Sequence, residues 1–234
     1  MEAGIIAPDG TRAPRTAQET TILPGVLPQP VLDGLFIVLA YRAGSLPVGV
    51  IVARLTGARD PRTVGSGRTG GTNALRAMGV RRAAAVATLD VLKGFLPVAA
   101  ASLLGASSLG VALTGVAAVL GAWRSVFLRF HGGRGVATGI GAALFIQPLA
   151  IPLAAPVFFG TIWLTRWVSL GSLLATAAGA GLVGLFVLLG WNDWPDFVFA
   201  VAGAAVVWIA HHDNIGRLLR GEERRFNPFA RGGG

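Results

Sequence analysis

Residues 168–190 read VSLGSLLATAAGAGLVGLFVLLG, an apolar run without a single charged side chain. A run of this length matches the roughly 20 residues that a helix needs to cross the ~30 Å hydrocarbon core of a bilayer. The next five residues, WNDWP at 191–195, are polar and contain a proline, and a second apolar run follows at 196–211. This stretch therefore predicts two membrane-spanning helices joined by a short loop.

The same pattern extends towards the N-terminus. The chain of 234 residues is 53% hydrophobic and only 13% charged, with a mean hydropathy of +0.64, whereas soluble domains carry about 25% charged residues. Its 34 glycines are spread through apolar stretches, where small residues let membrane helices approach closely. We expect apolar segments at 31–56, 83–104, 108–129, 135–148, 149–166, 168–190 and 196–211. The run from 135 to 166 is either one long helix or two short ones broken near Gln147-Pro148.

The distribution of positive charge favours two helices in that run. With seven spans, 16 of the 20 lysine and arginine residues fall on one side, from Arg54 through 57–82, in 123–134, at Arg166 and in the C-terminal tail, whereas the opposite loops 105–107, 147–149 and 191–195 carry none. Loops rich in lysine and arginine stay in the cytoplasm. We therefore predict an all-α integral membrane protein of the plasma membrane, with seven transmembrane helices, an extracellular N-terminus and a cytoplasmic C-terminus. A six-span arrangement would place Arg217–Arg231 opposite 57–82.

The two ends of the chain differ from its middle. Residues 1–30 are polar, contain five prolines and lack the apolar run of a secretory signal. We predict a flexible N-terminal tail at 1–30, a membrane domain at 31–226 and a C-terminal tail at 227–234.

The composition also argues against several classes of function. The net charge of +9 lies between apolar segments, not on one face of a soluble domain, so we expect no nucleic-acid partner. The absence of cysteine excludes disulfides, thiolate metal sites and a cysteine nucleophile. With three histidines and few carboxylates, we expect no metal and no cofactor. The expected surroundings are the lipid bilayer, and no protein partner is evident.

A first candidate site is the loop at 57–82, which contains DPRTVGSGRTGGTN at 60–73. Glycine tolerates positive φ, so successive backbone N–H groups can face one concavity and hold an anion. Neutral donors and arginines accompany the glycines, although the GxxxxGK[ST] spacing of a P-loop is missing. The alternative is a flexible cytoplasmic loop. The residues of interest are Arg62, Gly65, Ser66, Gly67, Arg68, Gly70, Gly71, Thr72, Asn73 and Arg76.

A second candidate is FHGGRGVAT at 130–138, where a glycine-rich turn precedes an apolar segment. The unpaired N–H groups and the dipole at a helix N-terminus both favour an anion. Arg134 lies within this turn. The alternative is a close helix crossing that requires glycine.

A third candidate is HHDNIGRLLRGEE at 211–223, which follows the last apolar segment. His211 and Asn214 are three residues apart and would share one helix face. Together with Arg217 and Glu223 they resemble a polar site. The alternative is a structural histidine, followed by arginines that meet anionic lipid.

Three further charges lie inside apolar segments. Asp90 and Lys93 are three residues apart, and charges at membrane depth normally pair and face the protein interior. A buried structural pair is the alternative to a role in the site. Arg42 has no obvious partner nearby, and the sequence does not indicate whether Arg42 or Lys93 reaches a site.

The three loop candidates share a side of the membrane and a chemistry. All lie on the arginine-rich side, and all offer cations or backbone N–H groups instead of a nucleophile. This combination is typical of a phosphate-handling site at the membrane surface.

In their order and spacing, six stretches resemble the PlsY family of bacterial acyl-phosphate-dependent glycerol-3-phosphate acyltransferases. The resemblance covers roughly residues 35–226. It rests on GSLP at 44–47, the loop at 60–73, DVLKG at 90–94, GGRGVAT at 132–138, SLGS at 169–172 and the stretch at 211–223.

The resemblance implies seven helices with cytoplasmic motifs, and it implies a reaction. The 1-hydroxyl of glycerol 3-phosphate attacks the carbonyl of a fatty acyl phosphate, and lysophosphatidic acid and phosphate are formed. The donor has a good leaving group, so no acyl-enzyme is required. The resemblance suggests catalytic roles for His211, Asn214, Asn73 and Arg134. It suggests substrate-binding roles for Ser45, Arg62, Ser66, Gly67, Gly70, Thr72, Gly132, Gly133, Gly135, Ser169, Ser172, Arg217 and Glu223.

The chain departs from the family pattern at several positions. The family normally has asparagine where this chain has Arg68 and histidine where it has Ala122. It has lysines at the positions of His131 and Arg134, alanine at Gly71 and proline at Ser125. The alternative to an active enzyme is therefore a catalytically impaired paralogue that acts as a lipid-binding or transporter-like membrane protein.

Overall fold

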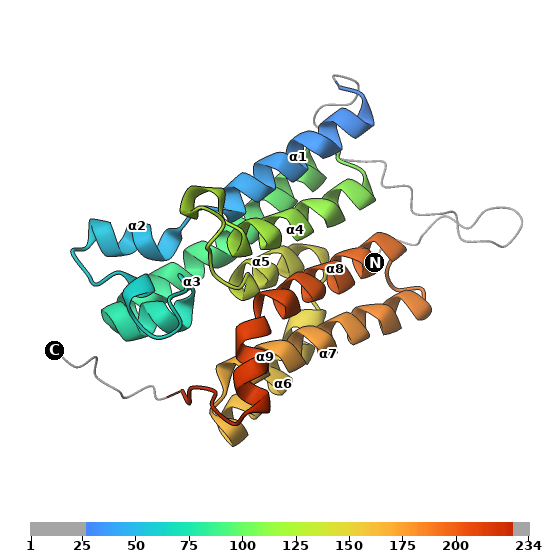
Figure 1. The fold of residues 1–234 in the computed structure, drawn as a ribbon. Coiled ribbons are helices and arrows are strands. Elements are labelled where there is room, and N and C mark those ends of the chain that lie inside the picture. The colour runs from blue at the N-terminus through green and yellow to red at the C-terminus, as the bar shows by residue number, and fades with distance from the viewer. Residues whose placement is uncertain (1–26, 227–234) are drawn as a thin grey trace, which may run out of the picture.

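The computed structural model describes residues 27–226, and within this range all regular secondary structure is helical (Figure 1). The sequence-based prediction of an all-α fold is confirmed for this range, while the two predicted tails fall largely outside it. The first helix begins at Gln29, just inside the predicted N-terminal tail. The helices are α1 (Gln29–Gly44), α2 (Val48–Leu55), η1 (Pro61–Thr63), α3 (Gly71–Leu103), α4 (Ser108–Trp123), η2 (Val126–Leu128), α5 (Val136–Ile146), α6 (Ala150–Thr165), α7 (Val168–Leu188), α8 (Trp194–Ala210) and α9 (His212–Leu219).

Helix length and composition support a membrane protein. Within the described range, three helices are long and apolar enough to cross a membrane by themselves, or up to five if each of two bent pairs forms one span. The bent pairs are α1 with α2, at 45°, and α8 with α9, at 63°. Helices α5 and α6 are apolar but shorter. At 1.5 Å per residue, the 11 residues of α5 rise only about 16 Å.

Three predicted segment boundaries are resolved by the structure. The segment 31–56 is not one helix, because Pro47 separates α1 from α2 and its ring cannot continue a helix interior. Helix α3 begins at Gly71, inside the predicted loop 57–82, and is kinked at Gly79, whose φ is 76°. The charged side chains near the start of α3 lower its hydropathy, so an apolar pattern does not reveal this part of the helix. The run from 135 to 166 does form two helices, which break at Gln147.

Helix α4 lies at the centre and packs against α1, α3, α5 and α8. Glycine makes the closest crossings possible. A Cβ on Gly44 would collide with the carbonyl of Ala118 on α4, and a Cβ on Gly94 of α3 would collide with the carbonyl of Thr138 on α5. Small residues permit such close backbone approach in membrane bundles. Gly44 and Gly94 are therefore packing positions.

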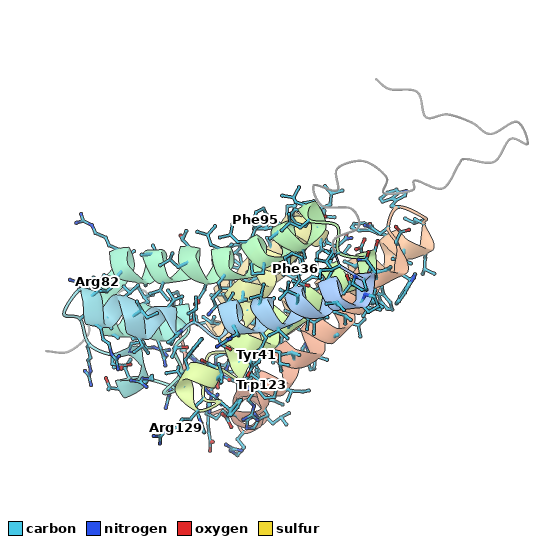
Figure 2. All side chains as sticks on the ribbon, turned by 90° about the horizontal axis from the view of Figure 1, so that it is seen from above. Phe36, Tyr41, Arg82, Phe95, Trp123 and Arg129 are labelled. Carbon is cyan, nitrogen blue, oxygen red and sulfur yellow. The ribbon has the colours of Figure 1, made fainter. Side chains whose placement is uncertain are left out.

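The helices alternate in direction, so their connections gather at two ends (Figure 1). We call one the arginine-rich end; it holds residues 56–70, 124–135, 166–167 and 211–226. Figure 2 shows Arg82 and Arg129 towards this end and Phe36 and Phe95 farther along the bundle. The opposite end holds residues 104–107, 147–149 and 189–193.

A carboxylate ties two helices together at the opposite end. Asp33 of α1 accepts hydrogen bonds from the backbone N–H of Ser107, at 2.9 Å, and from its hydroxyl, at 2.5 Å. The hydroxyl of Ser107 in turn accepts from the N–H of Gly110 at the start of α4. Acidic residues hold this end together, whereas arginines gather at the other.

Candidate active site

A polar cavity of about 280 Å³ opens at the arginine-rich end. Segments far apart in the sequence line it: the end of the loop with the start of α3, the starts of α5 and α7, the junction of α8 and α9, and the segment after α9. The three loop candidates of the sequence therefore share one pocket. The predicted site residues that line it are Ser66, Gly70, Thr72, Asn73, Gly133, Arg134, Gly135, Ser169, Ser172, His211, Asn214, Arg217 and Glu223.

Three helices begin at this cavity, namely α3, α5 and α7. The first turn of a helix has N–H groups without intrahelical partners, and the helix dipole adds partial positive charge there. The alternation of helix direction brings these three starts to the same end. The cavity is consequently positive even before its arginines are considered.

The N–H groups of the glycine turn are used differently from the sequence-based expectation. Gly132 N–H donates to Trp123 O at 3.0 Å, and Gly133 N–H donates to Ala122 O at 2.8 Å. A Cβ on Gly132 would collide with the Ala122 carbonyl. Gly132 thus permits the turn to approach the end of α4 closely, which was the alternative to an anion site. It does not line the cavity. The N–H groups available to an anion are those that follow, at the start of α5.

Arg134 is a half-buried cation with no ion-pair partner among residues 27–226. Its Nε and Nη2 atoms are buried and make no hydrogen bond within the described part of the chain. Burial, with the charges of Arg68 and Arg217 adding to it, lowers the pKa of Arg134 to about 10, so the guanidinium is still charged at neutral pH. Because an unpaired buried charge is costly, this arrangement is typical of a site that receives an anion.

Glu223 organises the opposite wall of the cavity. Its carboxylate accepts hydrogen bonds from Ser169 Oγ at 3.0 Å, Asn214 Nδ2 at 2.6 Å and Arg217 Nε at 2.8 Å. The side chain of Glu223 is only 7% exposed. One carboxylate therefore joins the start of α7 to α9, and it fixes three side chains that the sequence assigns to the site.

His211 lies directly after α8 ends at Ala210, outside the spanning helix, and is 3% exposed. Its Nδ1 is 2.7 Å from Val207 O, and because a carbonyl oxygen only accepts, Nδ1 carries the proton. Burial lowers the pKa of His211 to about 4. The neutral ring therefore leaves Nε2 as a hydrogen-bond acceptor, which suits a substrate hydroxyl.

Asn73 holds the glycine-rich loop in one conformation. Its Nδ2 donates to Val64 O, Ser66 Oγ and Arg68 O at 2.9–3.1 Å. Its Oδ1 accepts from Arg76 Nη1 at 3.1 Å. Gly65 and Gly67 have positive φ, at 56° and 70°. The side chain of Asn73 is used within the loop, so we assign it a positioning role.

Four predicted residues do not line the cavity: Ser45, Arg62, Gly67 and Gly132. Ser45 is 1% exposed, and its carbonyl accepts a hydrogen bond from Ser125 Oγ. Arg62 pairs with Asp60 at 2.7 Å. Arg42, the unassigned cation of the first apolar segment, is exposed.

Other lining residues were not assigned to the site from the sequence. Lys93 Nζ lies 2.8 Å from Asp90 Oδ1 and 3.0 Å from Leu46 O, and both Asp90 and Lys93 line the cavity. Their three-residue spacing inside an apolar helix was the available signal. Thr138 and Arg224 also line the cavity, as does Arg76 of the first candidate loop.

Two of the departures from the family pattern also fall here. Arg68 and Ala122 both line the cavity. Arg68 Nη2 lies 3.2 Å from Asp213 Oδ2, so the side chain joins the glycine-rich loop to α9. Ala122 contributes no polar group at its position.

A second cavity, of about 350 Å³, adjoins the first. It lies between α5, α6, α7 and α8, and its lining is almost wholly apolar. The two cavities share Val136, Ile140, Phe158 and Ser172. A polar pocket at one end of the bundle thus continues into an apolar space between helices.

Comparisons with known proteins give a consistent assignment. The sequence model of the glycerol-3-phosphate acyltransferase family matches residues 34–221. A glycerol-3-phosphate acyltransferase of Desulfotalea psychrophila is 41% identical over 197 residues, covering 82% of this chain and 98% of the relative. One from Thermus thermophilus is 42% identical over 194 residues, covering 83% and 95%.

A solved structure supports the same assignment. The glycerol 3-phosphate form of PlsY, an integral membrane glycerol 3-phosphate acyltransferase, superposes with a TM-score of 0.75 at 36% identity, covering 83% of this chain and 96% of that one. The lysophosphatidic acid form of PlsY gives a TM-score of 0.73. The chain belongs to the glycerol-3-phosphate acyltransferase family of integral membrane proteins.

Proposed function

We propose that the protein transfers a fatty acyl group from acyl phosphate to the 1-hydroxyl of glycerol 3-phosphate and forms lysophosphatidic acid and phosphate. The observation that carries the proposal is the unpaired guanidinium of Arg134 in a pocket where three helices begin. Both substrates carry phosphate, and one of them also carries an acyl chain.

The two cavities suit these two kinds of group. Phosphate oxygens would bind Arg134, Arg68 and the N–H groups at the helix starts, where charge-assisted hydrogen bonds are strong. The acyl chain of the donor would extend into the apolar cavity. The shared residues between the cavities would then surround the acyl carbonyl, and Ser172 lines both spaces.

The reaction needs little covalent chemistry from the protein. The hydroxyl oxygen forms an ester bond to the acyl carbon, the bond from that carbon to the phosphate oxygen breaks, and phosphate leaves with the electron pair. His211 Nε2 would orient the hydroxyl, and the departing phosphate would take its proton. Positioning and stabilisation of developing negative charge are the contributions that the residues can make.

We infer that α1, α3, α4, α5, α6, α7 and α8 are seven spans, with the arginine-rich end in the cytoplasm and the N-terminus outside. The alternation of helix direction and the absence of lysine and arginine from the loops 104–107, 147–149 and 189–193 support this orientation. The predicted tail at 1–30, membrane domain at 31–226 and tail at 227–234 remain part of this proposal.

The orientation can be tested with single cysteines, because the chain contains none of its own. A membrane-impermeant maleimide is expected to label Asp193→Cys in intact cells and Arg220→Cys only after permeabilisation. Both positions are exposed at opposite ends of the bundle. Labelling of Arg220→Cys in intact cells would contradict a cytoplasmic site.

The activity can be tested with the purified protein in lipid vesicles. Palmitoyl phosphate and glycerol 3-phosphate are expected to yield phosphate and lysophosphatidic acid in equal amounts, and omission of glycerol 3-phosphate should stop both. Palmitoyl-CoA serves as the control donor and should give no product. Product formation from palmitoyl-CoA but not from palmitoyl phosphate would refute acyl phosphate as the donor. No turnover from either compound would favour the catalytically impaired, lipid-binding alternative.

A further inference from the structure

We propose that Gln147, held by Asp196, closes the far end of the apolar cavity and limits the length of the acyl chain that the protein accepts. The inference rests on the proposed function, since it concerns the acyl donor. It assigns a specificity-determining role to a polar cluster at the end of the bundle away from the arginines.

The apolar cavity runs along the helices from the arginine-rich end towards the opposite end. Along α5 and the residue that follows it, the lining extends from Val136 to Gln147, and on α7 it extends from Ser172 to Val183. Each stretch rises about 16 Å at 1.5 Å per residue. One leaflet occupies half of a ~30 Å hydrocarbon core, about 15 Å. The lining of the cavity is therefore about as long as one leaflet is thick.

The residues that line the far end of the cavity are buried. Gln147, Ala150, Val183 and Phe199 line it there, and each is between 3% and 5% exposed. Three of these four residues are apolar. Gln147 is the exception, and nothing in an apolar cavity wall calls for an amide at this place.

The amide of Gln147 is fixed by a carboxylate. Its Nε2 donates to Asp196 Oδ2 at 2.7 Å, and Asn192 Nδ2 donates to the same oxygen at 3.0 Å. The backbone carbonyl of Gln147 also accepts from Ala150 N–H across the break between α5 and α6. Moving the side chain would break a charge-assisted bond and leave a partly buried carboxylate short of a donor. An aliphatic side chain could change rotamer at much smaller cost.

A fixed amide at the end of the cavity discriminates between acyl chains of different length. A chain that ends before Gln147 gains from every methylene that it buries, by about fourfold in affinity for each. A longer chain must either displace the amide or bend back, so its extra methylenes gain nothing. Affinity should therefore rise with chain length only up to the carbon that reaches Gln147.

The test compares myristoyl, palmitoyl, stearoyl and arachidoyl phosphates with the full-length protein in vesicles. Gln147→Ala removes the amide and should raise kcat/KM for arachidoyl relative to palmitoyl phosphate by roughly tenfold or more. Ala150→Leu fills the same end and should shift the preference in the opposite direction, towards myristoyl phosphate. Because the two changes act in opposite directions, Ala150→Leu tests the inference even if Gln147→Ala fails to fold.

A matched control uses another glutamine at the same end. Gln29→Ala removes an amide that binds Asp33 and lies outside the cavity, and it should leave the ratio of chain lengths unchanged. Chain-length profiles of both cavity variants that superimpose on wild type would overturn the inference. Absence of any turnover by wild type would instead overturn the proposed function itself.

Discussion

Substitution of Arg134 by glutamine is expected to lower kcat/KM for acyl transfer by at least about a hundredfold, because one preorganised electrostatic contact contributes 10²–10³-fold in comparable sites. Two of its guanidinium nitrogens are buried without a partner, so a bound anion is the group that would satisfy them. Steady-state kinetics in vesicles measures this effect.

The same substitution should not lower the thermal unfolding midpoint of the ligand-free protein, since it removes a half-buried charge that forms no ion pair within residues 27–226. Arg134→Lys keeps a cation but lacks the planar fork, and an intermediate rate is expected. Arg82→Gln is the matched control, because Arg82 is an exposed arginine at the same end of the bundle (Figure 2). Wild-type kinetics for Arg134→Gln, or a loss of stability without a loss of rate, would contradict the assignment.

Substitution of Glu223 by glutamine is expected to reduce both stability and activity. The carboxylate receives three donors, among them Arg217 at 2.8 Å. Removing one partner of a buried ion pair costs about 3–5 kcal/mol. Because the Arg217 side chain is 24% exposed, the free energy of unfolding in detergent should fall by less than that amount, and kcat/KM should fall as Asn214 and Ser169 lose their fixed positions.

The neighbouring residue offers a matched control for Glu223. Glu222 forms an ion pair with Arg220, but those side chains are 58% and 60% exposed, and exposed pairs contribute little. Glu222→Gln should therefore match wild type in stability and rate. Adding Arg217→Met to Glu223→Gln should restore part of the lost stability without restoring activity. Equal stability and equal rates for Glu222→Gln and Glu223→Gln would show that the hydrogen bonds of Glu223 have no special role.

Much of this fold can be predicted from the sequence, because membrane insertion depends on the length of apolar segments and on the charges between them. Apolar length and the position of arginines predicted the break at Gln147 and the convergence of remote motifs at one end. The start of α3 at Gly71 was missed because Arg76, Arg81 and Arg82 make its first turns polar. Hydropathy reports what crosses the bilayer and not where a helix begins.

The site is less predictable, because the use of a hydrogen-bonding group depends on its neighbours in space. Gly132 and Gly133 looked like anion ligands, but their N–H groups cap the carbonyls at the end of α4. The resemblance suggested a catalytic role for Asn73, and only the structure shows that its amide also holds the glycine-rich loop. The spacing of Asp90 and Lys93 suggested a pair, yet only packing shows that the pair faces the cavity. The apolar cavity has no sequence motif at all.

The alternation of helix direction restricts how such a chain can change over evolution. Loss of one helix from the middle would reverse every helix after it and carry Ser169 or His211 to the wrong face of the membrane. Loss or gain of an antiparallel pair would leave all later helices pointing as before. Insertions and deletions that preserve the site should therefore come in hairpins, and shuffled relatives should differ by even numbers of crossings.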